Sequence, residues 1–322
     1  MDGIPGSDSE GLGTMDKQLV FVIGSTRSGT SWLHQMLAEH PSVASLKQEL
    51  SVFSNYVAPI MRAFEQEDVR EKHLNHGLPV VMPRAEFLAG VKLAVAGVYE
   101  RVLATNPSAS HVLDKRPDYG RHIPLIEELV PNARYIHIIR DGRDVAISMR
   151  SAGKRVGGFT DDIGIAVREW ARSVSMAMRA GSGIGPARYL EVRYEKLMQE
   201  PAGELQRIFD FLGLAVDRTR VERIAAEYDS TKKLVSQGDT SLNALRGTSD
   251  AIWMSRLTLK ERYIIDRMAG ALLKQLGYAT EDWWVFSASD KRRMWTAMFV
   301  QKLRRSVRAV QHIWSNPEYK AD

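Results

Sequence analysis

The sequence predicts an α/β fold with a doubly wound, mainly parallel sheet, helices on both faces and a P-loop-like phosphate-binding loop. Short apolar runs rich in branched residues have the composition of buried parallel strands. A helix-like stretch follows each run, and this alternation is typical of parallel sheets with crossover helices. The first run also leads into a glycine-flanked turn that opens a helix, which is where such folds bind phosphate.

The predicted elements follow one another in a clear order along the chain. The strands are residues 19–23 (LVFVI), 111–113, 134–139 (RYIHII) and 188–192 (RYLEV). Two long helical segments, 55–74 and 85–104, have no strand between them and predict a helical insertion over the active-site end of the sheet. Further helical patterns cover residues 163–180, 202–212, 218–228 and 259–276.

Composition divides the 322 residues into three parts: a disordered lead-in at 1–16, one domain at 17–280 and a basic, tryptophan-rich helical extension at 281–322. Residues 283–322 hold eight basic and three acidic side chains, so the net charge of +5 lies there. Such a helix can lie on an anionic membrane surface as a peripheral contact. The alternatives are a helix docked on the domain or one that contacts a second subunit in a homodimer.

Composition also excludes several classes of protein. There is no cysteine, which excludes disulfide scaffolds, thiolate metal sites and cysteine catalysis, and no metal-ligand spacing is present. The small positive charge favours anionic partners without indicating a nucleic-acid binder. With no signal segment and no apolar run of about 20 residues, we expect a cytoplasmic protein, at most peripheral to a membrane, from a bacterial source.

The strongest motif is LVFVIGSTRSGTSWLHQML, in which Gly24 and Gly29 have the spacing of a P-loop. Glycines let the backbone N–H groups and the helix N-terminus face one anion. Thr30 stands where a nucleotide triphosphatase has lysine, which argues against ATP or GTP hydrolysis. Arg27 supplies a permanently charged fork for a phosphate or sulfate oxygen. The alternative is an ordinary glycine turn between a strand and a helix.

The segment STRSGTSWLHQMLAEHP resembles the R-S-G-T-[ST] loop of sulfotransferases that use 3′-phosphoadenosine 5′-phosphosulfate (PAPS), in the form found in tyrosylprotein, Golgi and many bacterial members. In that family the loop binds the 5′-phosphosulfate. The resemblance implies this role for Arg27, Ser28, Gly29, Thr30 and Ser31.

A second anion site is predicted at the end of another strand, in RYIHIIRDGRDVAISM. Strand ends of this kind line the ligand crevice of a doubly wound sheet. The segment resembles the family's second signature, which implies that Arg140 and Ser148 hold the 3′-phosphate of the nucleotide. Asp144 is then structural, as a helix cap or as a partner that orients an arginine. Taken alone, an arginine at a strand end is more often half of a surface ion pair.

Weaker similarities extend over roughly residues 19–278. The segment YLEVRYEKL resembles a family strand and turn, and we interpret Arg193, Tyr194 and Glu195 in it as packing and ion-pair residues. LRGTSDAIW resembles the mobile loop that closes over the nucleotide, which implies cofactor contacts for Arg246 and Gly247. The family often has R-K-G there, whereas this sequence has Leu245 before Arg246.

The catalytic base is expected at Glu49, in SLKQELSVF, where several family members carry a glutamate. Here Lys47 and Gln48 precede it, and the alternative is a solvated carboxylate at a helix start. DKRPDYGRH matches the K-T-H-L-P segment of cytosolic members at Lys115, which would bind the sulfonate or orient the substrate. The histidine of that segment is Pro117 here, so His122 is the alternative base.

Together these features imply metal-independent transfer of a sulfuryl group from PAPS to a hydroxyl by in-line displacement, with Glu49 as base and Arg27 and Lys115 as catalytic cations. The acceptor is a glycolipid, a carbohydrate, a lipid alcohol or a natural product. Two other functions stay open: a P-loop-type nucleotide kinase and a nucleotide-binding protein with a decayed site.

Overall fold

The structure of the protein is a computed structural model. It describes residues 19–46, 48–74, 77–156, 158–228, 252–281, 283, 284 and a few isolated residues between 288 and 299. The predicted lead-in at 1–16, Lys47, Arg246 and Gly247 lie outside the described residues, as does nearly all of the predicted extension at 281–322.

The predicted parallel sheet is confirmed. The described residues form five parallel strands in the order β2-β3-β1-β4-β5. They are β1 (Leu19–Gly24), β2 (Val43–Ser45), β3 (His111–Lys115), β4 (Arg134–Ile139) and β5 (Tyr189–Arg193). The chain runs from β1 to β2 and β3 on one side and then crosses to β4 on the other. A ligand crevice is expected at the carboxyl ends of the strands where this direction reverses.

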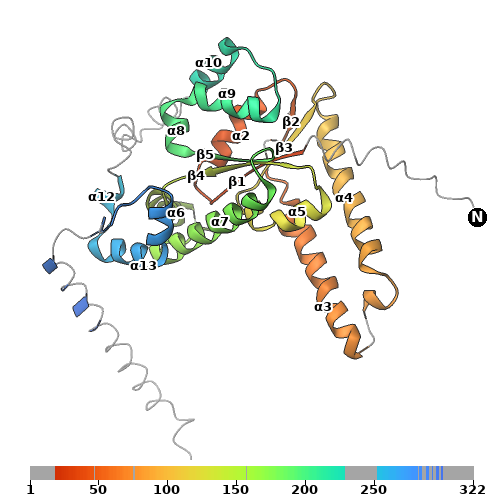
Figure 1. Cartoon of the computed structure of the whole chain (residues 1–322), viewed down its shortest axis with the longest axis horizontal. Helices are drawn as coiled ribbons and strands as arrows, with labels where there is room; N and C mark the ends of the chain where they lie inside the picture. The colour runs from red at the N-terminus through yellow and green to blue at the C-terminus, as the bar shows by residue number, and fades with distance from the viewer. Residues whose placement is uncertain are drawn as a thin grey trace, which may run out of the picture.

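Helices cover both faces of the sheet, as predicted (Figure 1). Alternation along β1 explains this, because Leu19, Phe21 and Ile23 belong to one core cluster and Val20 and Val22 to the other. The first face is covered by η3 (Pro117–Arg121), α5 (Ile123–Leu129), α7 (Ile163–Ile184) and part of α4 (Arg84–Ala104). The second is covered by α2 (Thr30–Ala38), α8 (Tyr194–Gln199), α9 (Pro201–Leu212) and α10 (Arg218–Glu227).

A third cluster of buried apolar side chains surrounds Trp170 at the edge of the sheet. It joins α6 (Gly142–Val156) and α7 to the C-terminal helices α12 (Ile252–Arg256) and α13 (Leu259–Gln275). A capping box between Thr258 and Glu261 fixes the start of α13. Residues far apart in the sequence therefore meet beside the end of β4.

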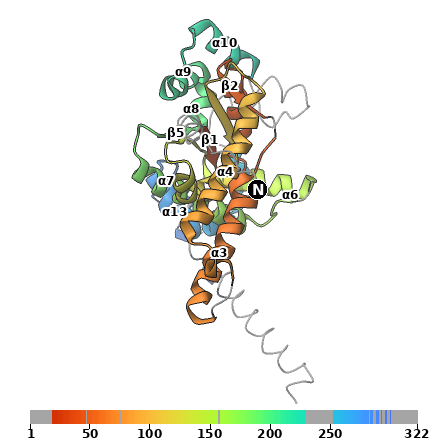
Figure 2. The same ribbon diagram turned by 90° about the vertical axis from the view of Figure 1, so that its right-hand side faces the viewer.

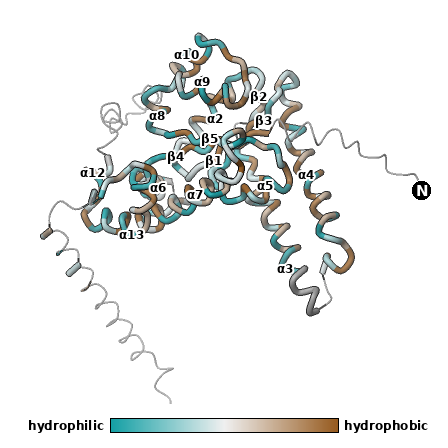
Figure 3. Tube along the Cα trace, in the orientation of Figure 1, coloured by the Kyte–Doolittle hydropathy of each residue, from teal (hydrophilic) through white to brown (hydrophobic). Residues whose placement is uncertain are grey.

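The predicted helical insertion is present as α3 (Ala58–Leu74) and α4, joined through the short turn η2 (Leu78–Val80). The two helices project side by side from the body (Figures 1 and 2), and hydrophobic segments run along α4 (Figure 3). The helix expected from residue 55 begins instead at Ala58, after the π-helical turn η1 (Val52–Val57). Ser51, with φ of 56°, starts that turn just beyond Glu49.

Candidate active site

The loop between β1 and α2 has the backbone of an anion-binding turn. Arg27 has φ of 72° and Gly29 has φ of 95°, and such left-handed residues within a turn direct successive N–H groups toward one point. No side chain caps the N-terminus of α2, and the buried Oγ of Ser28 has no hydrogen-bond partner among the described residues. Free donors at a helix N-terminus suit an anionic ligand.

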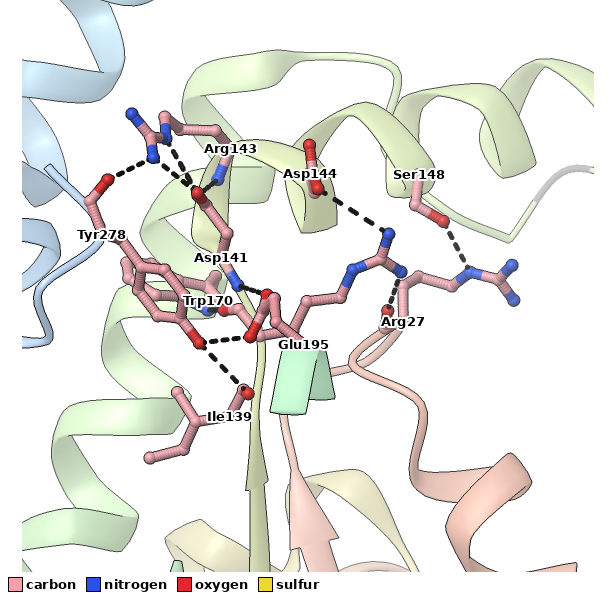
Figure 4. Close-up of polar contacts among 10 residues, drawn as sticks. Arg27, Ile139, Asp141, Arg143, Asp144, Ser148, Trp170, Glu195 and Tyr278 are labelled. Atoms are coloured by element: carbon pink, nitrogen blue, oxygen red, sulfur yellow. Dashed lines mark hydrogen bonds and ion pairs between the residues drawn. The ribbon is translucent and has the colours of Figure 1, made fainter. Parts of the chain in front are cut away.

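The structure brings the two predicted anion sites together. Arg27 Nε donates a hydrogen bond to Ser148 Oγ on α6 at 3.2 Å, as Figure 4 shows. Arg140 follows β4 directly and donates to the carbonyl oxygen of Arg27 at 3.3 Å. Three residues from two motifs more than a hundred positions apart thus form one constellation, as their strand ends predicted.

This constellation carries positive charge that is only partly offset by a neighbouring carboxylate. Burial lowers the pKa of Arg27, and the neighbouring charges of Arg140 and Arg155 lower it further. The carboxylate nearest to Arg140 is Asp144, at a long 3.9 Å. Burial raises the pKa of Asp144 to about 6, although Arg140 opposes the rise. A bound anion would relieve the repulsion between the two guanidinium groups, so the electrostatics favour an anionic ligand here.

Tyr194 is a residue of this region whose contacts sequence reasoning missed. The Arg140 guanidinium lies 4.4 Å from the centre of the Tyr194 ring, and Trp32 meets the ring edge-on at 5.9 Å. A Cβ on Gly29 would lie 2.7 Å from this ring, so the loop packs directly against it. The available signal was position, because Tyr194 is the first residue after β5 and therefore reaches the carboxyl edge of the sheet.

The predicted base Glu49 lies in a second cluster, at the carboxyl end of β3. Its carboxylate forms an ion pair with Lys115 through one oxygen and with Arg116, at 2.5 Å, through the other. Lys115 is buried and also donates to Ser31 Oγ at 3.0 Å, so it connects Glu49 to the phosphate loop. Arg116 also pairs with Asp118 at 3.0 Å. The sequence indicated Lys115 but not Arg116, its neighbour on the next position.

The charges around Glu49 decide its protonation state. Burial alone would raise the pKa of Glu49, but hydrogen bonds and charge from Lys115 and Arg116 outweigh it and hold the pKa below the usual value. Glu49 is therefore ionised at neutral pH. A carboxylate in this state can accept a proton from an acceptor hydroxyl.

His122, the alternative base, lies between η3 and α5. It precedes α5 as the N-terminal flanking residue, and its backbone N–H bonds to Tyr119. Burial lowers the pKa of its imidazole. None of the hydrogen bonds found among the described residues joins its ring to Glu49, Lys115 or Arg27.

No group of three or more histidine, aspartate or glutamate side chains among the described residues has the arrangement of a metal site. No described helix combines the length and the apolar character needed to cross a bilayer.

The fold and the site define a protein with two linked cationic groups at the carboxyl edge of a doubly wound sheet, beside an ionised carboxylate. Comparison with known proteins identifies the class. The model of the sulfotransferase family matches residues 19–218, which is more than half of the chain. The chain therefore belongs to the sulfotransferase family, whose members are enzymes that transfer a sulfuryl group.

Individual relatives agree with this assignment. The chain is 24% identical over 263 residues to protein-tyrosine sulfotransferase A of Caenorhabditis elegans, covering 80% of this chain and 67% of that protein. It is 25% identical over 291 residues to the nodulation protein NoeE of Sinorhizobium fredii, covering 81% and 66%. The crystal structure of sulfotransferase STF9 from Mycobacterium avium superposes with a TM-score of 0.51, 15% identity and coverage of 85% and 80%, which shows a shared fold.

Proposed function

We propose that this sulfotransferase takes its sulfuryl group from PAPS and transfers it to a hydroxyl acceptor, with Glu49 as general base. The observation that supports PAPS most directly is the linked pair of anion sites. PAPS carries a 5′-phosphosulfate and a separate 3′-phosphate, and a ligand with two anionic groups matches two cationic sites joined by the Arg27–Ser148 and Arg140–Arg27 hydrogen bonds.

In this proposal the phosphate loop holds the 5′-phosphosulfate. The N–H groups of the turn and the Arg27 guanidinium would stabilise the phosphate that leaves. Ser28, Gly29, Thr30 and Ser31 supply the rest of the cradle, and the unpartnered Ser28 hydroxyl is one donor for it. Arg140, with Ser148 beside it, would fix the 3′-phosphate and so set the position of the whole nucleotide.

The sulfuryl transfer itself is proposed as a single in-line displacement. The acceptor oxygen forms a bond to sulfur while the bond from sulfur to the bridging phosphate oxygen breaks. Glu49 takes the hydroxyl proton, and 3′-phosphoadenosine 5′-phosphate (PAP) leaves. Lys115 lies between Glu49 and Ser31 of the loop, which suits a cation that neutralises charge on the group in transfer.

The acceptor is proposed as an alcohol or phenol within a glycolipid, carbohydrate, lipid alcohol or natural product. The named relatives include a protein-tyrosine sulfotransferase, and the tyrosine side chain also carries a hydroxyl group. The ionised state of Glu49 suits any of these, because a carboxylate base needs only a hydroxyl within hydrogen-bond reach.

One experiment tests the proposal in two stages. Calorimetry with PAP should show binding that does not need magnesium, and labelled PAPS should pass its sulfuryl group to a component of an alcohol, phenol and lipid panel. Absence of PAP binding would overturn the proposal. Magnesium-dependent ATP binding would favour a nucleotide kinase instead, and PAP binding without transfer to any acceptor would favour a decayed site.

A further inference from the structure

The backbone on either side of Arg140 is held by side chains from α7, from α8 and from the segment after α13. Arg140 and Asp141 lie between the end of β4 and the start of α6, outside regular structure. Trp170 donates to the carbonyl oxygen of Arg140 at 3.0 Å, and the Tyr278 hydroxyl lies 3.2 Å from the carbonyl oxygen of Ile139. The N–H group of Asp141 donates to Glu195 at 2.9 Å. Figure 4 shows these contacts converging on one turn.

Two of these side chains also bind each other. Tyr278 donates its hydroxyl to the second carboxylate oxygen of Glu195 at 2.8 Å, so the Glu195 carboxylate bridges Tyr278 and the Asp141 N–H. Both residues are largely buried, where an unpaired carboxylate or hydroxyl would be costly. Breaking the bridge would leave a largely buried polar group unpaired, so the bridge constrains the path of the chain through Arg140.

A buried cation extends the same support to the C-terminal segment. Arg143 donates to the Asp141 carboxylate at 2.6 Å and to the carbonyl oxygen of Tyr278. Its guanidinium lies 4.0 Å from the ring centre of Trp253 and 4.9 Å from that of Trp283. Residues 253–283 are thus tied to the turn that carries Arg140, although the family match ends at residue 218.

Apart from its 3.3 Å hydrogen bond to the carbonyl oxygen of Arg27, the Arg140 side chain has few fixed polar contacts. Its Nε has no hydrogen-bond partner among the described residues, and its ion pair with Asp144 is long at 3.9 Å. The direction of its guanidinium therefore depends on the backbone from which the side chain extends, and on the Tyr194 ring beneath it.

We infer that Glu195 and Tyr278 are positioning residues for Arg140, and that the C-terminal segment thereby contributes to recognition of the ligand's second anionic group. The inference rests on the proposed function for the identity of that group, the 3′-phosphate of PAP. In this role Glu195 is a bridge that keeps Arg140 beside the phosphate loop. The sequence predicted only a packing and ion-pair role for Glu195.

The test compares the full-length protein with Tyr278→Phe and Glu195→Gln. Phenylalanine lacks the donor, and a glutamine side chain offers only one acceptor oxygen to the two donors. The matched control is Tyr135→Phe, which removes a buried tyrosine–glutamate bond of 2.8 Å to Glu127 elsewhere on β4. Calorimetry measures the affinity for PAP and for adenosine 5′-phosphate, which lacks the 3′-phosphate, and hydrogen exchange measures protection of the Asp141 amide.

We expect both variants to weaken PAP binding roughly three- to tenfold, the size of one or two lost hydrogen bonds, with little change in adenosine 5′-phosphate affinity. The hydrogen-exchange rate of the Asp141 amide should rise in both variants and should not change in the control. Equal weakening for the two nucleotides, or an equal effect of Tyr135→Phe, would overturn the inference. If the unaltered protein fails to bind PAP, the proposed function falls, and the Asp141 exchange rates still decide whether the bridge holds this turn.

Discussion

The two halves of the active site differ in how their charges are paired. At the ends of β1 and β4, Arg27 and Arg140 lie close together, and the nearest acidic partner, Asp144, is 3.9 Å from Arg140. At the end of β3, the Glu49 carboxylate is already paired with Lys115 and Arg116 through both of its oxygens. The first half has charge left for a ligand, whereas the second is neutralised within the protein.

This difference suggests different tasks for the two halves. An unsatisfied pair of cations gains most from an incoming anion, so the first half is suited to binding. A carboxylate held by two cations is ionised and fixed in place, and its oxygens have lone pairs left to accept a hydrogen bond from an acceptor hydroxyl. The second half is therefore suited to proton transfer in a complex that the first half has already assembled.

The largest expected effect tests the second half through Glu49→Gln. The amide cannot take a proton, so we expect kcat to fall roughly 10²- to 10⁴-fold, the usual contribution of a general base. PAP affinity should change less than about twofold, because the hydrogen-bond partners of the loop are untouched. Transfer assays and calorimetry measure these quantities, with Glu169→Gln on α7 as control. A variant with an unchanged rate would place the base elsewhere.

The first half is tested by Arg140→Ala. If Arg140 holds the 3′-phosphate as proposed, loss of its charge-assisted hydrogen bonds should weaken PAP binding about 100-fold. Adenosine 5′-phosphate should lose much less affinity, since it lacks the 3′-phosphate. Arg218→Ala is the control, because that side chain is 91% exposed on α10. Equal losses for both nucleotides would mean that Arg140 does not recognise the 3′-phosphate.

The binding half was largely predictable from sequence. Arg27 and Gly29 lie in one short loop, and Arg140 and Ser148 in one strand-to-helix connection. Local spacing places each pair, and parallel strands bring their carboxyl ends to one edge of the sheet. The five-stranded parallel sheet and helices on both faces follow from the same alternation and are confirmed.

The contacts that sequence reasoning missed join residues far apart in the chain. Arg116 is a plain basic residue in the sequence, and only the fold brings it to Glu49, 67 positions away. Tyr278 reaches Glu195 across 83 positions, through the packing of α13 against α7. Such partners depend on tertiary arrangement, which no local spacing encodes. The π-helical turn at Val52–Val57 was missed because its composition resembles that of an ordinary helix.

Gly29→Ala would disturb the contact between the loop and Tyr194. Alanine at φ of 95° is strained, and its Cβ would lie 2.7 Å from the Tyr194 ring. We expect the free energy of unfolding to fall by about 1–3 kcal/mol, and PAP binding to weaken by roughly tenfold as the loop shifts. Thermal unfolding and calorimetry measure the two effects.

The control is Gly203→Ala on α9, because nothing lies within 4 Å of a Cβ there. A variant with normal PAP affinity would show that the loop does not need this conformation.

The smallest expected effect comes from Arg116→Gln, which alters the charge balance around Glu49. Burial raises the Glu49 pKa, while Lys115 and Arg116 lower it. Arg116→Gln removes one lowering influence, so the pKa rises. Because the base works only when ionised, activity is lost as pH falls through this pKa, and the acid limb of the kcat/KM profile should move to higher pH. The rate on the plateau should change less than about fivefold, since the pair is partly exposed.

The control is Arg121→Gln, which breaks a similar pair with Glu169 and should leave the acid limb in place. An unmoved limb in Arg116→Gln would show that Glu49 does not set it.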